Sequence, residues 1–266
     1  MESTRWQRAL VTGSSQGIGH AFARALAARG CDLVLVARGR ERLEAVANEL
    51  TAAFSVEVET LVADLTGPQG LALAEDRLED GEQPIDLLVN NAGGASQHGP
   101  FLELDRDALL RDAYLNALAL LRLTHTGARS MAARGGGGIV NVSAGVAFYP
   151  LPGAAAYGAS KAFVNSLSEA LDYELRETGV RVTAVCPGFT RTGAQQRLGM
   201  NVDRLPALLW MEPDEVAAAA LLAAESGRAV SSLNLVGKLN AFFGRHLPRR
   251  ILLPQLSRGQ LRLIAR

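Results

Sequence analysis

Short runs of Val, Ile and Leu alternate along the chain with longer stretches in which apolar residues recur every three or four positions. The short runs predict buried β-strands and the longer stretches predict amphipathic α-helices, a pattern typical of β-α-β units around a parallel sheet. The expected strands cover residues 8–12, 32–36, 56–62, 85–89, 138–142 and 181–185. The expected helices cover residues 17–29, 40–53, 68–80, 104–134, 154–177 and 213–226.

These elements predict a doubly wound α/β fold of the Rossmann type. Right-handed crossovers place helices on both faces of a parallel sheet, and ligands bind at the carboxyl ends of its strands. A chain of 266 residues fits one such domain, and no internal repeat or low-complexity linker divides it. We therefore expect a single Rossmann-type domain over residues 1–228. A basic, apolar C-terminal extension over residues 229–266 would pack on or next to it.

Charge changes this picture only near the C-terminal end. The chain has 27 basic and 27 acidic residues, which gives no reason to expect nucleic acid as a partner. No acidic residue follows Glu225, whereas eight cationic residues do: Arg228, Lys238, Arg245, Arg249, Arg250, Arg258, Arg262 and Arg266. This extension could cover a substrate pocket, pack against a second subunit or make peripheral contact with an anionic bilayer. A helix packed on its own body, with its arginines in water, is at least as simple.

Cysteine and hydropathy patterns indicate the compartment. Cys31 and Cys186 are too few for a disulfide framework, and the first residues lack the apolar core of a signal peptide. No apolar run is long enough to span a bilayer. We expect a cytoplasmic protein with no transmembrane segment.

A glycine-rich turn directly follows the first predicted strand and opens the first predicted helix. It reads Thr12-Gly13-Ser14-Ser15-Gln16-Gly17-Ile18-Gly19. Glycine lets a pyrophosphate approach the backbone, and the N–H groups and positive end of the helix then stabilise it. Many such turns need glycine for geometry alone, but the position between a first strand and a first helix favours a nucleotide site. Its expected ligands are Gly13, Ser15, Gln16, Gly17, Ile18 and Gly19.

The second predicted strand ends in Ala37-Arg38 rather than in an acidic residue. An acid there would bind the ribose 2′-hydroxyl of NAD and repel a 2′-phosphate, whereas Arg38 attracts that phosphate, with Arg40 or Arg42 as further candidates. The alternative is that Arg38 only begins a solvated helix. The missing acid favours NADP(H) over NAD(H).

Four further segments, in order and spacing, resemble the short-chain dehydrogenase/reductase family. They are Asp64-Leu65, Asn90-Asn91-Ala92-Gly93, Tyr157-Gly158-Ala159-Ser160-Lys161, and Pro187-Gly188 followed by Thr192. With the glycine turn they cover residues 8–192. The resemblance implies that Asp64, with Leu65, contacts the adenine and that Asn90, Ala92 and Gly93 line the cofactor groove. It also implies that Thr192, with Thr190 nearby, contacts the nicotinamide, although Asn and Gly could simply end a strand.

Tyr157 and Lys161 form the expected chemical centre. They lie four residues apart on a predicted helix, so both project from one face. A phenol with a pKa of about 10 exchanges protons poorly near neutrality, and a nearby ammonium is expected to lower that pKa. The resemblance adds that Lys161 binds the cofactor ribose and that Asn116 orders a water in a proton relay. An exposed Tyr/Lys pair and a backbone-satisfied amide are the structural alternatives.

One position departs from the family. The resemblance implies a serine that binds the substrate carbonyl oxygen, and an ungapped alignment places it at Ala144, one residue after Ser143. Neighbours on a strand face opposite ways, so Ser143 replaces it only through a local rearrangement. A bulge at Ser143, another donor, or weak turnover are the three possible outcomes, and loss of one such donor lowers a rate about a hundredfold or more.

The function expected from these residues is NADP(H)-dependent hydride transfer between nicotinamide and a carbonyl or secondary alcohol, without a metal ion. The alternative is a nucleotide-binding regulatory or scaffold protein with weak or no catalysis. Leu198, Met200, Leu205, Leu208, Leu209, Trp210 and Met211 fall in the segment that caps the substrate in the family, which suits an apolar substrate. The family's usual last strand, ending in Asp-Gly-Gly, is absent near residues 229–236. The resemblance implies a homodimer or homotetramer through helices 104–134 and 154–177.

Overall fold

A seven-stranded parallel sheet forms the centre of the protein, whose computed structural model describes residues 6–193, 198 and 206–264. Its spatial order is β3-β2-β1-β4-β5-β6-β9, so that β2 and β3 lie on one side of β1 and the later strands, beginning with β4, lie on the other. Ligands of such folds bind at the carboxyl ends of the strands, beside the point where the strand order changes side. The strands are β1 (Arg8–Thr12), β2 (Asp32–Ala37), β3 (Val58–Val62), β4 (Leu87–Asn90), β5 (Gly137–Val142), β6 (Val180–Cys186) and β9 (Val230–Ser232).

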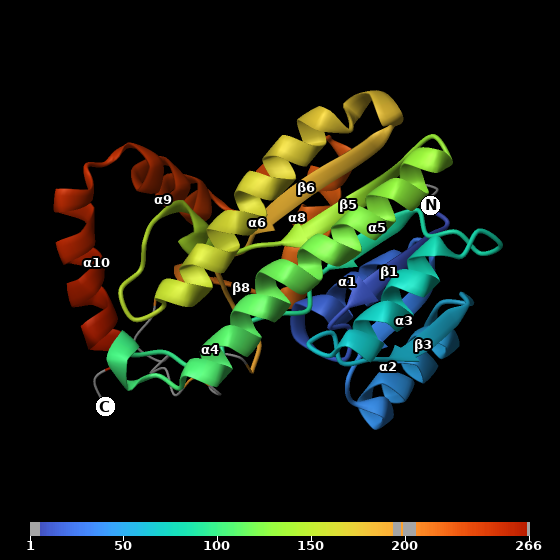
Figure 1. Ribbon diagram of the computed structural model, residues 1–266, viewed down its shortest axis with the longest axis horizontal. Helices are drawn as coiled ribbons and strands as arrows, with labels where there is room; N and C mark the ends of the chain where they lie inside the picture. The colour runs from blue at the N-terminus through green and yellow to red at the C-terminus, as the bar shows by residue number, and fades with distance from the viewer. Residues whose placement is uncertain (1–5, 194–197, 199–205, 265–266) are drawn as a thin grey trace.

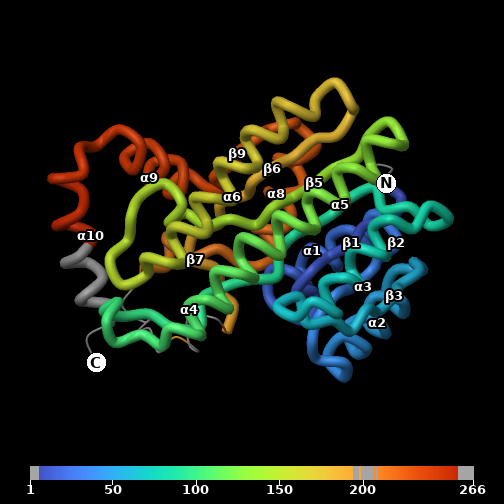
Figure 2. The backbone as a smooth tube through the Cα atoms, viewed as in Figure 1, coloured from blue at the N-terminus to red at the C-terminus, as the bar shows by residue number. Residues whose placement is uncertain are grey.

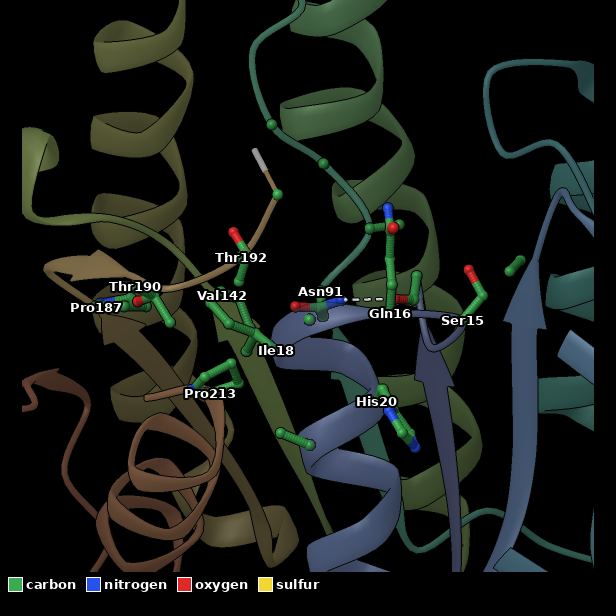
Figure 3. Close-up of a pocket in the computed structure, with 18 of the residues that line it drawn as sticks. Ser15, Gln16, Ile18, His20, Asn91, Val142, Pro187, Thr190, Thr192 and Pro213 are labelled. Atoms are coloured by element: carbon green, nitrogen blue, oxygen red, sulfur yellow. Dashed lines mark hydrogen bonds between the residues drawn. The ribbon is translucent and has the colours of Figure 1, made fainter. Parts of the chain in front are cut away.

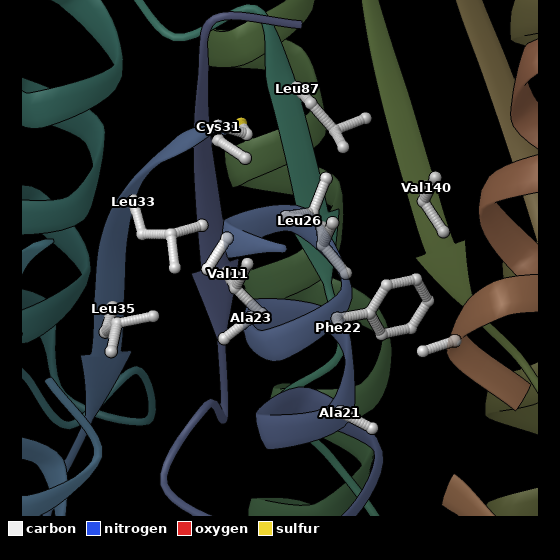
Figure 4. Packing of buried hydrophobic residues seen from close by; sticks show 14 of the residues in the cluster. Val11, Ala21, Phe22, Ala23, Leu26, Cys31, Leu33, Leu35, Leu87 and Val140 are labelled. Atoms are coloured by element: carbon white, nitrogen blue, oxygen red, sulfur yellow. The ribbon is translucent and has the colours of Figure 1, made fainter. Parts of the chain in front are cut away.

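Helices cover both faces of the sheet, which confirms the predicted Rossmann-type fold. One core packs α1 (Gly17–Ala27), α2 (Arg40–Ala53) and α8 (Pro213–Glu225) against the sheet. Figure 4 shows Phe22 and Leu26 of α1 lying over Val11, Leu87 and Val140 of three strands. The opposite face carries α3 (Pro68–Glu79), α5 (Leu120–Ala133) and α6 (Ala155–Glu174) (Figure 1).

Smaller elements complete the body. They are η1 (Phe101–Glu103), α4 (Arg106–Ala113), η2 (Tyr114–Ala119), η3 (Gly145–Phe148), η4 (Arg176–Thr178), η6 (Ala207–Leu209) and a two-stranded sheet of β7 (Phe189–Thr190) and β8 (Trp210–Met211). The helix predicted over 104–134 is interrupted, because η2 is a π-helical turn between α4 and α5. Such turns are uncommon and recur at functional sites.

The sheet extends further along the chain than the sequence pattern predicted. β9 pairs in parallel with β6, although it lies within the segment that we expected to be an extension from residue 229. Its three residues, Val-Ser-Ser, are too short and too polar to produce a strand signal, and the pairing comes from the adjacent edge of β6. The tail therefore consists of α9 (Leu235–His246) and α10 (Arg249–Ile264), which lie at the end of the molecule farthest from α2 and β3 (Figures 1 and 2). Within the described residues, no helix is both long and apolar enough to cross a membrane.

Candidate active site

A groove of about 870 Å³ opens at the carboxyl ends of the strands, a size within the roughly 300–1,000 Å³ range of ligand pockets. It runs from the turn between β1 and α1 to the start of α6, and Figure 3 shows Ser15, Gln16, Thr190 and Thr192 around it. The structure brings together most of the residues predicted to bind a cofactor. Those that line the groove are Gly13, Ser15, Gln16, Gly17, Ile18, Arg38, Asp64, Leu65, Ala92, Gly93, Tyr157, Lys161, Thr190 and Thr192.

The glycine turn has the geometry of a phosphate cradle. Gly13 and Gly17 have φ angles of +66° and +58°, a region that favours glycine. Gly19 does not line the groove; a Cβ there would overlap the carbonyl oxygen of Gly13, so its role is close packing of the helix under the turn. No side chain caps the N-terminus of α1, which leaves its positive end at the groove.

Asn90 does not line the groove, contrary to the prediction. It is buried, and its Nδ2 donates to Thr124 Oγ1 at 3.0 Å and to Asn141 Oδ1 at 2.9 Å. The next residue, Asn91, lines the groove instead and donates to the carbonyl oxygens of Thr12 and Gly13 (Figure 3). Since neighbours on a strand face opposite sides, only one of the two asparagines could reach the groove, and the sequence did not show which.

Two arginines, Arg38 and Arg42, line the groove near the end of β2. Arg38 directly follows β2 and has an exposed side chain. Arg40 does not line the groove and is paired with Glu44 at 3.2 Å. Asp64 lies in the same part of the groove. Burial opposes ionisation of its carboxyl, but hydrogen bonds from Thr66 and the charge of Arg38 outweigh it and lower its pKa.

Tyr157 and Lys161 meet at the other end of the groove. Lys161 is only 4% exposed, and its Nζ donates to the carbonyl oxygen of Val142 at 2.8 Å and lies 5.8 Å from the centroid of the Tyr157 ring. Burial raises the pKa of Tyr157 to about 12, with a smaller contribution from Cys186. Burial lowers the pKa of Lys161 to about 8.

The expected lowering of the Tyr157 pKa by Lys161 is therefore wrong for this structure. Burial disfavours the phenolate and is the largest cause of the raised pKa of Tyr157, while the Lys161 ammonium is bonded to a backbone carbonyl. Near neutral pH the phenol holds its proton and the ammonium its charge.

Ser143 and Ala144 both line the groove, but they face different ways. Ser143 is buried, and its hydroxyl donates to the carbonyl oxygen of Lys161 at 3.0 Å. Ala144 is fully extended, with φ −161° and ψ 159°, so no bulge turns Ser143 toward the expected position. Of the three outcomes considered, the bulge is ruled out.

Asn116 lies in the π-helical turn with its side chain bonded to the backbone. Its Nδ2 donates to the carbonyl oxygens of Gly94 at 2.6 Å and Asp112 at 2.7 Å, and its Oδ1 accepts from the Gly94 N–H at 2.9 Å. A cavity of about 10 Å³ beside it is lined by both Asn116 and Tyr157, which is space for about one water. The amide thus has the structural partners of the alternative account, and its place in a proton relay stays a prediction.

Cys186 is a neighbour of the centre that the sequence analysis did not identify. It ends β6 and is buried, and its Sγ donates to Asn165 Oδ1 at 3.3 Å. Burial raises its pKa to about 11. Its position at the carboxyl end of a predicted strand, just before Pro187, was the available signal.

The predicted substrate cap is described only in part. Met200, Leu205 and the side chain of Leu208 lie outside the described residues. The ring of Phe189 in β7 lies 5.8 Å from that of Trp210 in β8, and Arg191 lies over Trp210 at 5.0 Å. The cap residues whose side chains the structure describes are Leu198, Leu209, Trp210 and Met211, and all four are apolar.

The sequence profile of the short chain dehydrogenase family matches residues 7–203. A solved short-chain dehydrogenase from Sphingobium yanoikuyae, in complex with NADPH, is 40% identical, with a TM-score of 0.80 over 97% of this chain and 96% of that one. A bulky-bulky ketone specific alcohol dehydrogenase from Comamonas testosteroni is 34% identical, with a TM-score of 0.78 over 98% and 95%.

Among curated proteins, the human inactive hydroxysteroid dehydrogenase-like protein 1 is 34% identical over 190 residues, which are 71% of this chain and 56% of that protein. The chain thus spans a little over half of the length of this curated relative. The matched region contains the glycine turn, the Tyr157–Lys161 pair and Thr192, which supports the predicted family and nucleotide binding.

Replacement of Gly19 by Ala tests the phosphate cradle. The added methyl overlaps the Gly13 carbonyl, so the turn must open, and we expect NADPH binding to weaken at least about tenfold. Titration of NADPH fluorescence measures the dissociation constant. Gly81→Ala is the matched control, because nothing lies within 4 Å of a Cβ there. Equal affinity in the two variants would contradict the assignment.

Proposed function

The chain belongs to the short-chain dehydrogenase family, and on that premise we propose that it is an NADP(H)-dependent oxidoreductase that reduces a bulky, apolar carbonyl compound or oxidises the corresponding alcohol. The observation that carries the proposal is the placement of Tyr157 and Lys161 in the same groove as the glycine turn and Arg38. The residues suited to hold the adenosine side of a dinucleotide thus lie at one end of that groove, and the residues suited to move a proton lie at the other.

The residues fit a phosphorylated dinucleotide. The positive end of α1 and the glycine turn suit a pyrophosphate, and Arg38 with Arg42 suits the 2′-phosphate that distinguishes NADP(H). Ala92, Gly93 and Thr192 line the path to Tyr157, and a Cβ on Gly93 would crowd Asn116. When bound, the nicotinamide supplies or accepts the hydride.

Tyr157 supplies the proton in the direction of reduction. With a pKa of about 12, its phenol is protonated throughout the physiological range and can donate to a carbonyl oxygen that gains negative charge. Lys161 remains cationic below about pH 8 and favours the phenolate that remains after proton transfer. In this proposal Asn116 holds a water that returns a proton to Tyr157.

An apolar substrate is supported by the described cap. Phe189 and Trp210 stand on β7 and β8, next to the groove residues Gly188 and Thr190. The similar enzyme from Comamonas testosteroni is a bulky-bulky ketone specific alcohol dehydrogenase. We also propose a cytoplasmic location and a homodimer or homotetramer. Exposed apolar side chains support the latter: Leu110 and Leu118 before α5, and Phe163 and Tyr173 on α6.

A second candidate function rests on Ala144. No side-chain donor stands at that position, and Ser143 is committed to the Lys161 carbonyl. The similar human protein carries the word inactive in its name. The alternative is a nucleotide-binding protein of regulatory or scaffold function with weak or no turnover.

Replacement of Tyr157 by Phe separates binding from catalysis. The variant keeps the ring that packs in the groove but lacks the proton, so we expect unchanged NADPH affinity and a kcat at least about a hundredfold lower. Stopped-flow oxidation of NADPH with a panel of bulky ketones measures it. Tyr173→Phe, on the exposed side of the same helix, serves as the control. Full turnover in Tyr157→Phe would refute the assignment.

The pH dependence of reduction follows from Lys161. Because its pKa is lowered to about 8, its charge is present below that pH and is lost as pH rises through it. We expect kcat/KM to be constant near neutrality and to fall above about pH 8, while Tyr157 stays protonated until about pH 12. A flat profile to one pH unit above the Lys161 pKa would show that the ammonium charge is not needed.

Replacement of Arg38 by Ala tests the preference for NADP(H). A hydrogen bond to a charged group contributes about 1.5–3 kcal/mol, so kcat/KM for NADPH should fall about ten- to a hundredfold while that for NADH is retained. Arg40→Ala is the control, since Arg40 is also exposed but lies outside the groove. The same loss with both cofactors would show that Arg38 does not recognise the phosphate.

Replacement of Ala144 by Ser decides between the two candidate functions. If a missing donor limits the rate, the added hydroxyl should raise kcat about a hundredfold, and a protein that is inactive as it stands should gain turnover. The assay pairs ketones with NADPH and alcohols with NADP. Ser143→Ala, which removes the neighbouring hydroxyl, should give no such gain. An unchanged rate in Ala144→Ser would mean that position 144 does not limit catalysis.

A further inference from the structure

Helix α9 contacts the rest of the protein through the side that carries its glycines. Gly237 and Gly244 are buried, and a Cβ on Gly244 would lie 2.9 Å from the carbonyl oxygen of Phe148. Asn234 caps the helix, since its Oδ1 accepts from the Gly237 N–H at 2.7 Å, and Arg249 donates to the Gly244 carbonyl at 2.9 Å. These contacts fix which side of α9 faces the protein.

The large apolar residues of α9 lie on the other side. Leu235, Leu239 and Phe242 recur at helical spacing and are 72%, 49% and 55% exposed. Phe243, and Ile251 at the start of α10, are about half exposed beside them. A helix that only covered its own body would bury these side chains and expose its glycines, so the arrangement is the reverse of an ordinary amphipathic helix. An apolar patch of this kind marks a contact surface.

The charged residues of α9 and of the start of α10 are all basic. Lys238, Arg245, Arg249 and Arg250 have exposed side chains, and no acidic residue occurs after Glu225. A second copy that used the same patch through a two-fold axis would bring these cations together. The complementary partner is therefore anionic and has an apolar layer that accepts leucine and phenylalanine side chains.

We propose that α9 and the start of α10 dock on an anionic lipid bilayer. Leucine and phenylalanine enter the boundary between headgroups and acyl chains, while lysine and arginine stay at the headgroup phosphates. Both helices lie together at one end of the molecule (Figures 1 and 2). The protein is peripheral in this state.

The same contact places the active site near the bilayer. α9 packs on η3, the turn that follows Ala144, and Arg245 lies 5.1 Å from the ring of Phe148 in that turn. An apolar substrate dissolved in the bilayer would then meet the catalytic end of the groove. This consequence rests on the proposed function, whereas the docking itself does not.

Sedimentation of the full chain with vesicles tests the docking independently of activity. We expect it to sediment with phosphatidylglycerol/phosphatidylcholine vesicles, less at high salt, and not with phosphatidylcholine alone. Each cation near the surface contributes about fivefold to partition, so Lys238→Gln with Arg250→Gln should weaken it about 25-fold. Leu239→Ser with Phe242→Ser should abolish it.

Matched variants on other helices control for charge and surface leucine. Arg129→Gln lies on an exposed part of α5, and Leu222→Ser lies on α8 with 60% exposure. Both should bind vesicles like the parent protein, and circular dichroism checks that every variant folds. The proposal is overturned if the parent protein does not sediment with anionic vesicles, or if the α9 variants sediment as much as the parent protein does. Light scattering without lipid gives a further test. If the double variant Leu239→Ser with Phe242→Ser forms a smaller assembly than the parent protein, the patch belongs to a contact with a second copy and the proposal is overturned.

Discussion

Two hydrogen bonds between the end of β5 and α6 determine the geometry of the catalytic centre. The Lys161 ammonium donates to the Val142 carbonyl, and the Ser143 hydroxyl donates to the Lys161 carbonyl. Together they attach the helix that carries Tyr157 to the strand whose end forms the groove. They also keep Lys161 buried, and that burial lowers its pKa. The position of the phenol and the charge beside it thus depend on one contact between strand and helix.

This contact explains why Ser143 is a poor substitute for a serine at position 144. Its hydroxyl is already used to hold α6, and freeing it would leave the Lys161 carbonyl without that donor. Because the backbone is extended at Ala144, it is the Ala144 side chain, the one after Ser143, that faces the groove, and it offers only a methyl group. The substrate oxygen would therefore depend mainly on Tyr157 among the described side chains near it.

The sequence predicted the parts of the fold that follow from periodicity. Six strands and the helices between them appear close to their expected positions, because buried parallel strands are continuous apolar runs. β9 was missed because three residues carry too little pattern, and the π-helical turn at Asn116 has no periodic signature. The groove residues were predicted from motifs that resemble those of the family. The exchange of Asn90 for Asn91 shows the limit of that approach, since strand phase decides which neighbour faces the groove.

The chain's preference for arginine gives its amines an unusual distribution. Lys161 is buried at the centre, and Lys238 is exposed on α9, while every other basic side chain described is a guanidinium or an imidazole. Acylating reagents react with neutral amines, and they therefore have few targets on this protein besides an N-terminal amine. The tail lysine is open to solvent, whereas the lysine of lowered pKa is buried. Of the two lysines, acylation would thus label the one on α9.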